Sequence, residues 1–224
     1  MIARIAGLVS AILFVVATCL PVSAIEGIEQ RKERAKAEAL EAVPLAGKAL
    51  NEKNYDRAIE LLTKVIDANV LSGEELGKIY YERGVAFQAK KDCVKALADY
   101  NHALETFTTS DVLYFNRSIC HNEAKQPDEA LSDLDHAIKI KPDAMNYRVA
   151  RCIQLFNKKD FAGALPDCEM ALKSAPDDKS VLLAISQAAE QTGNKARAAV
   201  AYKHLLELDP GNAVATAGLK RVGN

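Results

Sequence analysis

The sequence contains no tryptophan, and only 6% of its 224 residues are aromatic. It has 11 glycines and 7 prolines, fewer than a collagen-like or low-complexity disordered chain would carry. Basic and acidic residues nearly balance, 29 against 30, so there is no surplus of positive charge of the kind that nucleic-acid binding requires. Runs of valine, isoleucine and threonine are rare, whereas alanine and leucine are abundant. We therefore expect an all-α protein with no nucleic-acid partner.

Long apolar runs are missing everywhere except at the N-terminus. Arg4 precedes an almost wholly apolar stretch, Ile5–Leu20, and Pro21 then interrupts any helix. The small residues of Val22-Ser-Ala24 stand where a signal peptidase would cut. The pattern predicts a cleaved signal peptide at residues 1–24, no stable membrane span after cleavage, and a periplasmic or secreted protein.

Two other fates of this segment fit the sequence less well. A retained membrane anchor needs about 20 apolar residues, and the run is short for that. A lipoprotein would be lipidated at Cys19, but Thr18 before it is bulkier than the small residue usual at that position.

The rest of the chain repeats with a period of 34 residues. Two sets of residues recur at that spacing. They are the alanines Ala96, Ala130, Ala164 and Ala198 and the prolines Pro142, Pro176 and Pro210. Within each unit the apolar residues fall three and four apart, which is the helical period. The pattern predicts helix–turn–helix units at 39–72, 77–110, 111–144, 145–178 and 179–212. Residues 25–38 would form a charged helical lead-in, and 213–224 a capping helix and tail, with Val214 and Leu219 facing inward.

Start and stop signals recur at matching positions. Four units place a capping residue at the start of the second helix, namely Asn54, Asp92, Asp160 and Asn194. In the third unit Gln126 is followed by Pro127, which suits the first position of a helix. Ser72-Gly-Glu-Glu75 resembles a capping box for the next helix.

The units resemble the tetratricopeptide repeat family. That family carries aromatic and small residues on the first helix, and alanine, a large residue and alanine on the second. The second unit supplies them as Tyr80, Gly84, Phe87, Ala96, Tyr100 and Ala103. The resemblance implies a right-handed superhelix of about five repeats, in which neighbouring units must stack to bury their apolar faces. The chain resembles exported bacterial members of the family in having an N-terminal signal.

The resemblance also implies a concave groove, lined by the first helices, that holds a protein or peptide partner. The positions transferred from the family are Tyr81, Val85, Gln88, Phe115, Asn116, Ile119, Asn122, Asn146, Val149, Ile153, Asn157, Leu183 and Gln187. The amides would pair with a peptide backbone, since asparagine and glutamine both donate and accept. Some of the apolar members would instead pack between repeats.

Arginine and aspartate also recur in step. Arg83, Arg117 and Arg151 lie on the first helices, and Asp99, Asp133 and Asp167 on the second helices of the same units. We expect a structural ladder of ion pairs rather than a ligand site.

Four cysteines remain after the predicted cleavage. We expect Cys152–Cys168 as the first possible disulfide and Cys93–Cys120 as the second, with four buried thiols as the alternative. No close CxxC pair points to a redox or zinc motif.

No motif of catalysis, cofactor binding or metal binding is found. The sequence has no phosphate-binding glycine loop, GxSxG or HExxH motif. His102, His136 and His204 share one repeat position, about 10 Å apart from unit to unit. One zinc ion needs each nitrogen within roughly 2.1 Å. The sequence therefore predicts a non-enzymatic binding scaffold. A self-associating structural module, forming a homo-oligomer, and an accessory subunit of an enzyme remain the alternatives.

Overall fold

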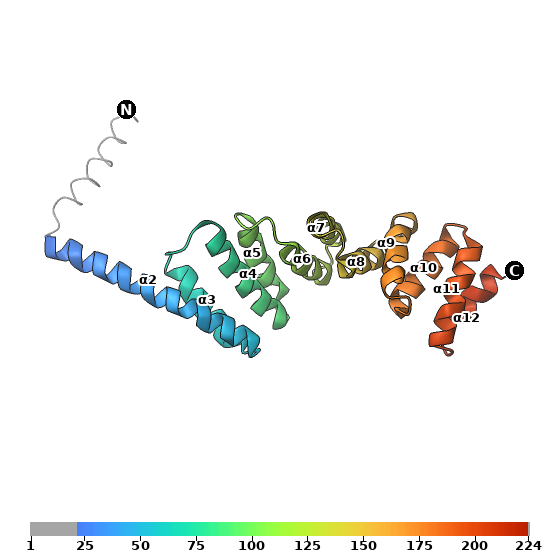
Figure 1. The fold of residues 1–224 in the computed structure, drawn as a ribbon, viewed down its shortest axis with the longest axis horizontal. Coiled ribbons are helices and arrows are strands. Elements are labelled where there is room, and N and C mark those ends of the chain that lie inside the picture. Colours follow the sequence, from blue (N-terminus) through green and yellow to red (C-terminus); the bar gives the residue numbers. More distant parts are fainter. Residues whose placement is uncertain (1–21, 224) are drawn as a thin grey trace, which may run out of the picture. The chain divides into compact units, whose positions relative to one another are not determined.

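The computed structural model describes residues 22–223, which form eleven α-helices and no strand (Figure 1). The predicted all-α repeat fold is confirmed. The chain divides into two compact units, one up to residue 72 and one from residue 73 on. Apart from residues 22–24, the predicted signal peptide, with Cys19, lies outside the described residues. Among the helices described, none has the length and apolar character needed to cross a membrane.

The first unit is a hairpin of α2 (Val22–Asn51) and α3 (Tyr55–Asp67). The predicted lead-in and the first repeat helix form one continuous helix, which passes through Pro44 without ending. Small residues at helical spacing make its buried stripe against α3, namely Ala39, Ala42, Ala46 and Ala49. These alanines let the two helices approach closely, and Leu62 and Val65 of α3 fill the space between them.

The second unit consists of successive helical hairpins. Its helices are α4 (Gly73–Ala89), α5 (Cys93–Leu104), α6 (Asp111–Glu123), α7 (Pro127–Ile140), α8 (Met145–Asn157), α9 (Phe161–Ser174), α10 (Lys179–Gln191), α11 (Lys195–Leu208) and α12 (Ala213–Val222). Each even-numbered helix from α4 to α10 packs on the odd-numbered helix that follows it, and each pair packs on the next. Helices α6, α8, α10 and α12 begin 34 residues apart. Together with α4 they are called the first helices below, and α3, α5, α7, α9 and α11 are called the second helices.

The predicted capping residues begin the second helices. The side chain of Asp92 accepts a hydrogen bond from the backbone N–H of Lys95 at 3.1 Å, and Asp160 accepts one from Gly163 at 3.0 Å. Asn54 and Asn194 cap α3 and α11 in the same way. Gln126 makes no such bond, and Pro127 takes the first helical position, where a missing N–H costs nothing.

Glycine allows a close helix crossing inside the α4–α5 hairpin. A Cβ atom added to Gly84 would lie 2.6 Å from a ring carbon of Tyr100, which is fully buried. The sequence pattern assigned this small residue to the crossing, and the structure confirms that a larger one does not fit.

The capping helix α12 is present, with Asn212 as its N-cap. The prediction that Val214 faces inward is wrong, because 42% of that residue is exposed. The buried positions are Ala215, Gly218 and Val222, and Leu219 packs beside them as predicted. Gly218 fixes this orientation, since its Cα lies against the ring of Tyr202 and leaves no room for a side chain.

Candidate functional site

A ladder of ion pairs orients the first helices against the second helices. Arg117 donates through Nε and Nη2 to the two carboxylate oxygens of Asp133, at 2.9 and 2.6 Å. The equivalent pairs are Arg83–Asp99 and Arg151–Asp167. All three aspartates are at most 3% exposed, so each needs its arginine to offset the cost of burying a charge. The arginines are therefore structural, as predicted, and are not free to bind a ligand.

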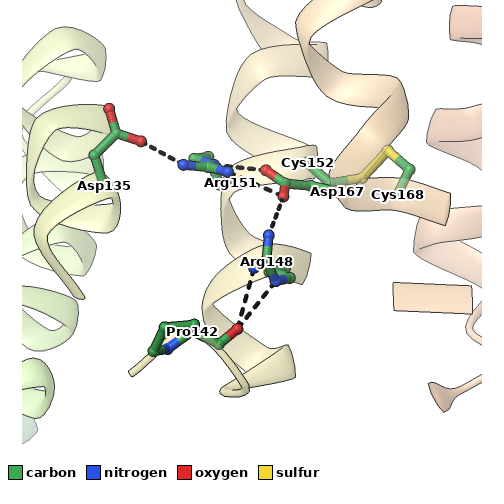
Figure 2. Close-up of polar contacts among 7 residues, drawn as sticks. All are labelled: Asp135, Pro142, Arg148, Arg151, Cys152, Asp167 and Cys168. Carbon is green, nitrogen blue, oxygen red and sulfur yellow. Dashed lines mark hydrogen bonds and ion pairs between the residues drawn. A yellow bond between two sulfur atoms is a disulfide. The ribbon is translucent and has the colours of Figure 1, made fainter. Parts of the chain in front are cut away.

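The ladder also joins one repeat to the next. Arg151 donates to Asp167 within its own hairpin and to Asp135 of the preceding second helix at 2.6 Å (Figure 2). Arg117 reaches Asn101 in the same way, at 2.8 Å. Figure 2 also shows Arg148, which bridges Asp167 and the carbonyl oxygen of Pro142. The hydrogen bonds to Asp167 raise the pKa of Arg151 above its usual value.

Two disulfides tie the same region together. Cys152–Cys168 joins α8 to α9 within a hairpin, with a Cα–Cα distance of 5.2 Å (Figure 2). Cys93–Cys120 joins α5 to α6 across two repeats, with a Cα–Cα distance of 5.1 Å. These are the two pairings considered from the sequence. Cys93 is partly exposed, and the other three cysteines are fully buried.

The three histidines that share a repeat position lie apart from one another. His102 stacks on Tyr80 and His136 on Tyr114, each at 4.9 Å between ring centroids. His204 lies 2.9 Å from Asp177. His102 and His136 are thus held within their own repeats, and His204 by the end of the preceding repeat.

The predicted groove residues of α4 are engaged with other protein groups. The Tyr81 hydroxyl accepts a hydrogen bond from Asn116 at 3.2 Å, and Gln88 accepts one from Tyr100 at 2.5 Å. Val85 packs against a buried cluster around Tyr100. Burial raises the pKa of both Tyr81 and Tyr100, so their hydroxyls stay protonated and keep these bonds.

Three more of the predicted groove residues are apolar and pack against the core. Phe115 lies 4.8 Å from the ring of Tyr147, and Val149 and Leu183 pack against buried clusters. Asn146 is exposed on the first turn of α8.

The predicted residues that come together around open space lie on α6 and α8. Ile119, Asn122, Ile153 and Asn157 line one cleft of about 230 Å³. Leu134, Ala130, Ala150 and Ser118 complete its apolar and small-residue walls, and Gln154 is also part of its lining. We call this space the central cleft.

Gln154 lines the central cleft but is not among the positions transferred from the family. It is only 6% exposed, and its side-chain amide bonds to no other group among residues 22–223. No fully buried side-chain N or O atom of the described residues lacks a hydrogen-bond partner, so the amide of Gln154 reaches the space of the central cleft. The repeat pattern contains a signal that marks Gln154 as unusual. The equivalent positions of the other units hold Ala86, Cys120 and Ala188, which are small and buried.

The side-chain amides that line the central cleft have no hydrogen-bond partner among the described residues. Like Gln154, the side chains of Asn122 and Asn157 make no hydrogen bond within the described part of the chain, and both are exposed. Three amides therefore border a space whose remaining walls are largely apolar. Such a site suits an extended peptide, whose backbone offers donors and acceptors and whose side chains offer apolar surface.

A second space lies beside the first and shares Asn157 with it. It encloses about 340 Å³ and is lined by Phe156, Phe161, Lys159, Gln187, Gln191, Glu190 and Arg221. We call it the C-terminal hollow. Arg221 donates to Glu190 at 2.5 and 2.9 Å and lowers the pKa of that carboxyl, which therefore stays ionised.

Residues 154–213 match the family model described as tetratricopeptide repeat. This segment belongs to the tetratricopeptide repeat family. The matched segment begins at Gln154 and contains the whole of the fifth predicted unit, 179–212. No curated protein matches the sequence.

Solved tetratricopeptide repeat structures share the fold. The crystal structure of YrrB, described as a TPR protein with an unusual peptide-binding site, superposes with a TM-score of 0.73 at 17% identity, covering 86% of this chain and 97% of that one. MamA gives 0.67 at 16% identity, covering 79% of this chain and 94% of that one. A tetratricopeptide repeat protein from Parabacteroides merdae gives 0.67 at 15% identity, over 83% and 72% of the chains. At these identities the likeness establishes the fold alone.

Proposed function

We propose that this protein is a non-enzymatic adaptor of the bacterial cell envelope that binds an extended peptide segment of a partner protein in the central cleft. Tetratricopeptide repeats serve as scaffolds for protein–protein interaction, and this provides the general class. We expect the peptide to bind in the central cleft, which α6 and α8 line.

The observation that carries the proposal is the amide of Gln154. Most of the side chain is buried, yet its amide makes no hydrogen bond within the described residues and reaches the central cleft, whereas the repeat equivalents are small residues. A bound peptide backbone would supply the missing hydrogen bonds.

Peptide-library selection on the immobilised full chain tests the proposal. Synthetic versions of the enriched peptides are then titrated by fluorescence anisotropy against the parent and a Gln154→Leu variant. We expect the variant to bind about tenfold more weakly, the size expected for one lost hydrogen bond to a buried group. Enrichment of no peptide above a bare surface would refute the proposal, as would equal affinity of parent and variant.

A Gln88→Leu variant serves as the matched control. Gln88 is also a first-helix glutamine, but its side chain accepts a hydrogen bond from Tyr100. Its replacement should lower stability and leave peptide affinity unchanged. Circular dichroism of each variant shows whether the helices are intact.

The envelope location rests on the apolar N-terminal segment and the small residues before Ile25. Intact-mass analysis of the protein from fractionated bacterial cells tests it. We expect a chain that begins at Ile25 in the periplasmic fraction. An uncleaved chain in the cytosolic fraction would refute the location and leave the peptide cleft untouched.

A further inference from the structure

The C-terminal hollow has a counterpart two repeats earlier, and the two differ in their chemistry. The counterpart encloses about 360 Å³ and is lined by Lys91, Asp92, Cys93, Val94, Leu97, Glu123 and Ala124. Residues 91, 93 and 123 stand 68 positions before Lys159, Phe161 and Gln191, which line the C-terminal hollow. Both spaces therefore arise from the same turn of the repeat, and their differences are specific to the units.

The first difference is apolar surface. Phe161 replaces Cys93, and Phe156 adds a second ring, with the ring centroids 5.8 Å apart at an angle of 59°. Two inclined aromatic rings form a wall against which a flat or branched apolar side chain can pack. The counterpart has no aromatic residue in its lining.

The second difference is charge. The counterpart contains one lysine and two acids, Lys91 with Asp92 and Glu123. The C-terminal hollow contains two cations and one acid, Lys159 and Arg221 with Glu190. Since Arg221 and Glu190 pair with each other, Lys159 is the cation left over.

Lys159 forms no ion pair among the residues described, and Gln191 stands where the counterpart has an acid. Lys159 also adopts a left-handed backbone conformation, with φ of 64°, at a position where the next unit has Gly193. A lysine at such a position costs backbone free energy that glycine avoids. Lys53, Lys91 and Lys125 adopt the same conformation at the equivalent turns, so this cost belongs to the repeat and does not distinguish the two hollows.

From this geometry, and building on the proposed peptide cleft, we infer that the C-terminal hollow is a specificity pocket for an acidic, apolar segment of the same ligand. A large apolar side chain of the peptide packs on Phe156 and Phe161, and a neighbouring carboxylate pairs with Lys159. Asn157 lines both spaces and connects them. The charge balance selects an acidic peptide over a basic one.

The distance between the two spaces sets the spacing of the ligand's side chains. Successive first helices lie about 10 Å apart, and an extended peptide advances about 3.3 Å per residue. The ligand therefore carries an apolar residue for the central cleft and, about three residues away, an apolar residue next to an acid.

Selection of random peptides on the immobilised full chain tests the inference. We expect enriched peptides to share an apolar residue, and an apolar–acidic pair about three positions away. Selection on a Lys159→Gln variant should keep the first feature and lose the preference for an acid. Enrichment without any acidic preference, or with a basic one, would overturn the inference.

Titration of an enriched peptide against three variants completes the test. Lys159→Gln and Gln191→Glu should each weaken binding about threefold or more, because the first removes the free cation and the second supplies it with an internal partner. Lys91→Gln is the matched control at the same turn of the counterpart hollow, and it should leave affinity unchanged.

The outcomes separate this inference from the proposed function. Weakened binding by Gln154→Leu, with no effect of Lys159→Gln or Gln191→Glu, leaves the cleft standing and refutes the pocket. Equal weakening by Lys159→Gln and Lys91→Gln refutes it as well, since the effect then comes from general surface charge. Failure of every peptide to bind the parent chain refutes both.

Discussion

Asp133 of α7 is 1% exposed, and both of its carboxylate oxygens accept hydrogen bonds from Arg117 of α6. The pair repeats at Arg83–Asp99 and Arg151–Asp167. It fixes the angle at which each first helix meets its second helix. The walls of the central cleft, which come from α6, α7 and α8, depend on this geometry.

Loss of one ladder arginine should therefore be costly. Arg117→Ala leaves Asp133 buried without its partner, and we expect it to lower the free energy of unfolding by about 3 kcal/mol or more. Arg57→Ala is the control, since both members of the Arg57–Glu60 pair are well exposed, and it should cost less than about 1 kcal/mol. Urea unfolding measures both. The double variant Arg117→Met, Asp133→Leu should recover part of the loss, and a double variant as unstable as the single one would contradict the argument.

Two substitutions in the turns between first and second helices should change the free energy of unfolding in opposite directions. Gly193 has φ of 82°, so Gly193→Ala should lower the free energy of unfolding by about 1 kcal/mol. Lys125 has φ of 59°, and Lys125→Gly should raise it by about 0.5 kcal/mol. Thermal and urea unfolding test the pair. Stabilisation by Gly193→Ala would show that the turn does not need the left-handed conformation.

High pH should loosen the C-terminal repeats. Burial, together with the hydrogen bond to Glu190, raises the pKa of Tyr202 from its usual value of 10.0 to about 12. The raised pKa means that the folded state holds the hydroxyl proton more tightly than the unfolded chain does. This contribution to stability is complete below about pH 10 and is lost as the pH rises through about 12.

A Tyr202→Phe variant removes this proton and tests the prediction. Between about pH 9 and about pH 11.5 its free energy of unfolding should fall less steeply than that of the parent. Parallel pH profiles would contradict the assignment. Tyr55 is partly exposed on α3, so Tyr55→Phe provides a control for general alkaline effects.

The two disulfides should differ in how fast thiols reduce them. Cys152–Cys168 is fully buried on both sides, whereas Cys93 is partly exposed and lines an open hollow. Since exchange requires access of a thiolate to sulfur, we expect Cys93–Cys120 to be reduced first. Differential alkylation followed by peptide mass analysis of the folded protein measures the order. Faster reduction of Cys152–Cys168 would contradict it.

The sequence predicted the repeat fold because its signals are local and repeated. Asn54, Asp92, Asp160 and Asn194 cap helices wherever they occur, and the arginine–aspartate spacing places both partners on facing helices. Pattern alone misplaced Val214 because apolar residues occur on more than one face of this ten-residue helix. The contact of Gly218 with Tyr202 decides that orientation, and it depends on tertiary packing.

The candidate site was only partly accessible to sequence reasoning. Family positions located Ile119, Asn122, Ile153 and Asn157, which share the central cleft. They also included Val85 and Leu183, which pack against the core, because one helix face serves both roles. Gln154 was missed since a buried position was not expected to carry an amide.

The comparison of Gln154→Leu with Gln88→Leu tests the central claim most directly, with stability and peptide affinity measured on the same full-length proteins. Gln154→Leu should change the free energy of unfolding by less than about 1 kcal/mol, because the amide makes no hydrogen bond within the protein, and should weaken peptide binding about tenfold. Gln88→Leu should lower the free energy of unfolding and leave peptide affinity unchanged, since it leaves the Tyr100 hydroxyl without its acceptor. A Gln154→Leu protein that is less stable and binds peptide as well as the parent would contradict the account.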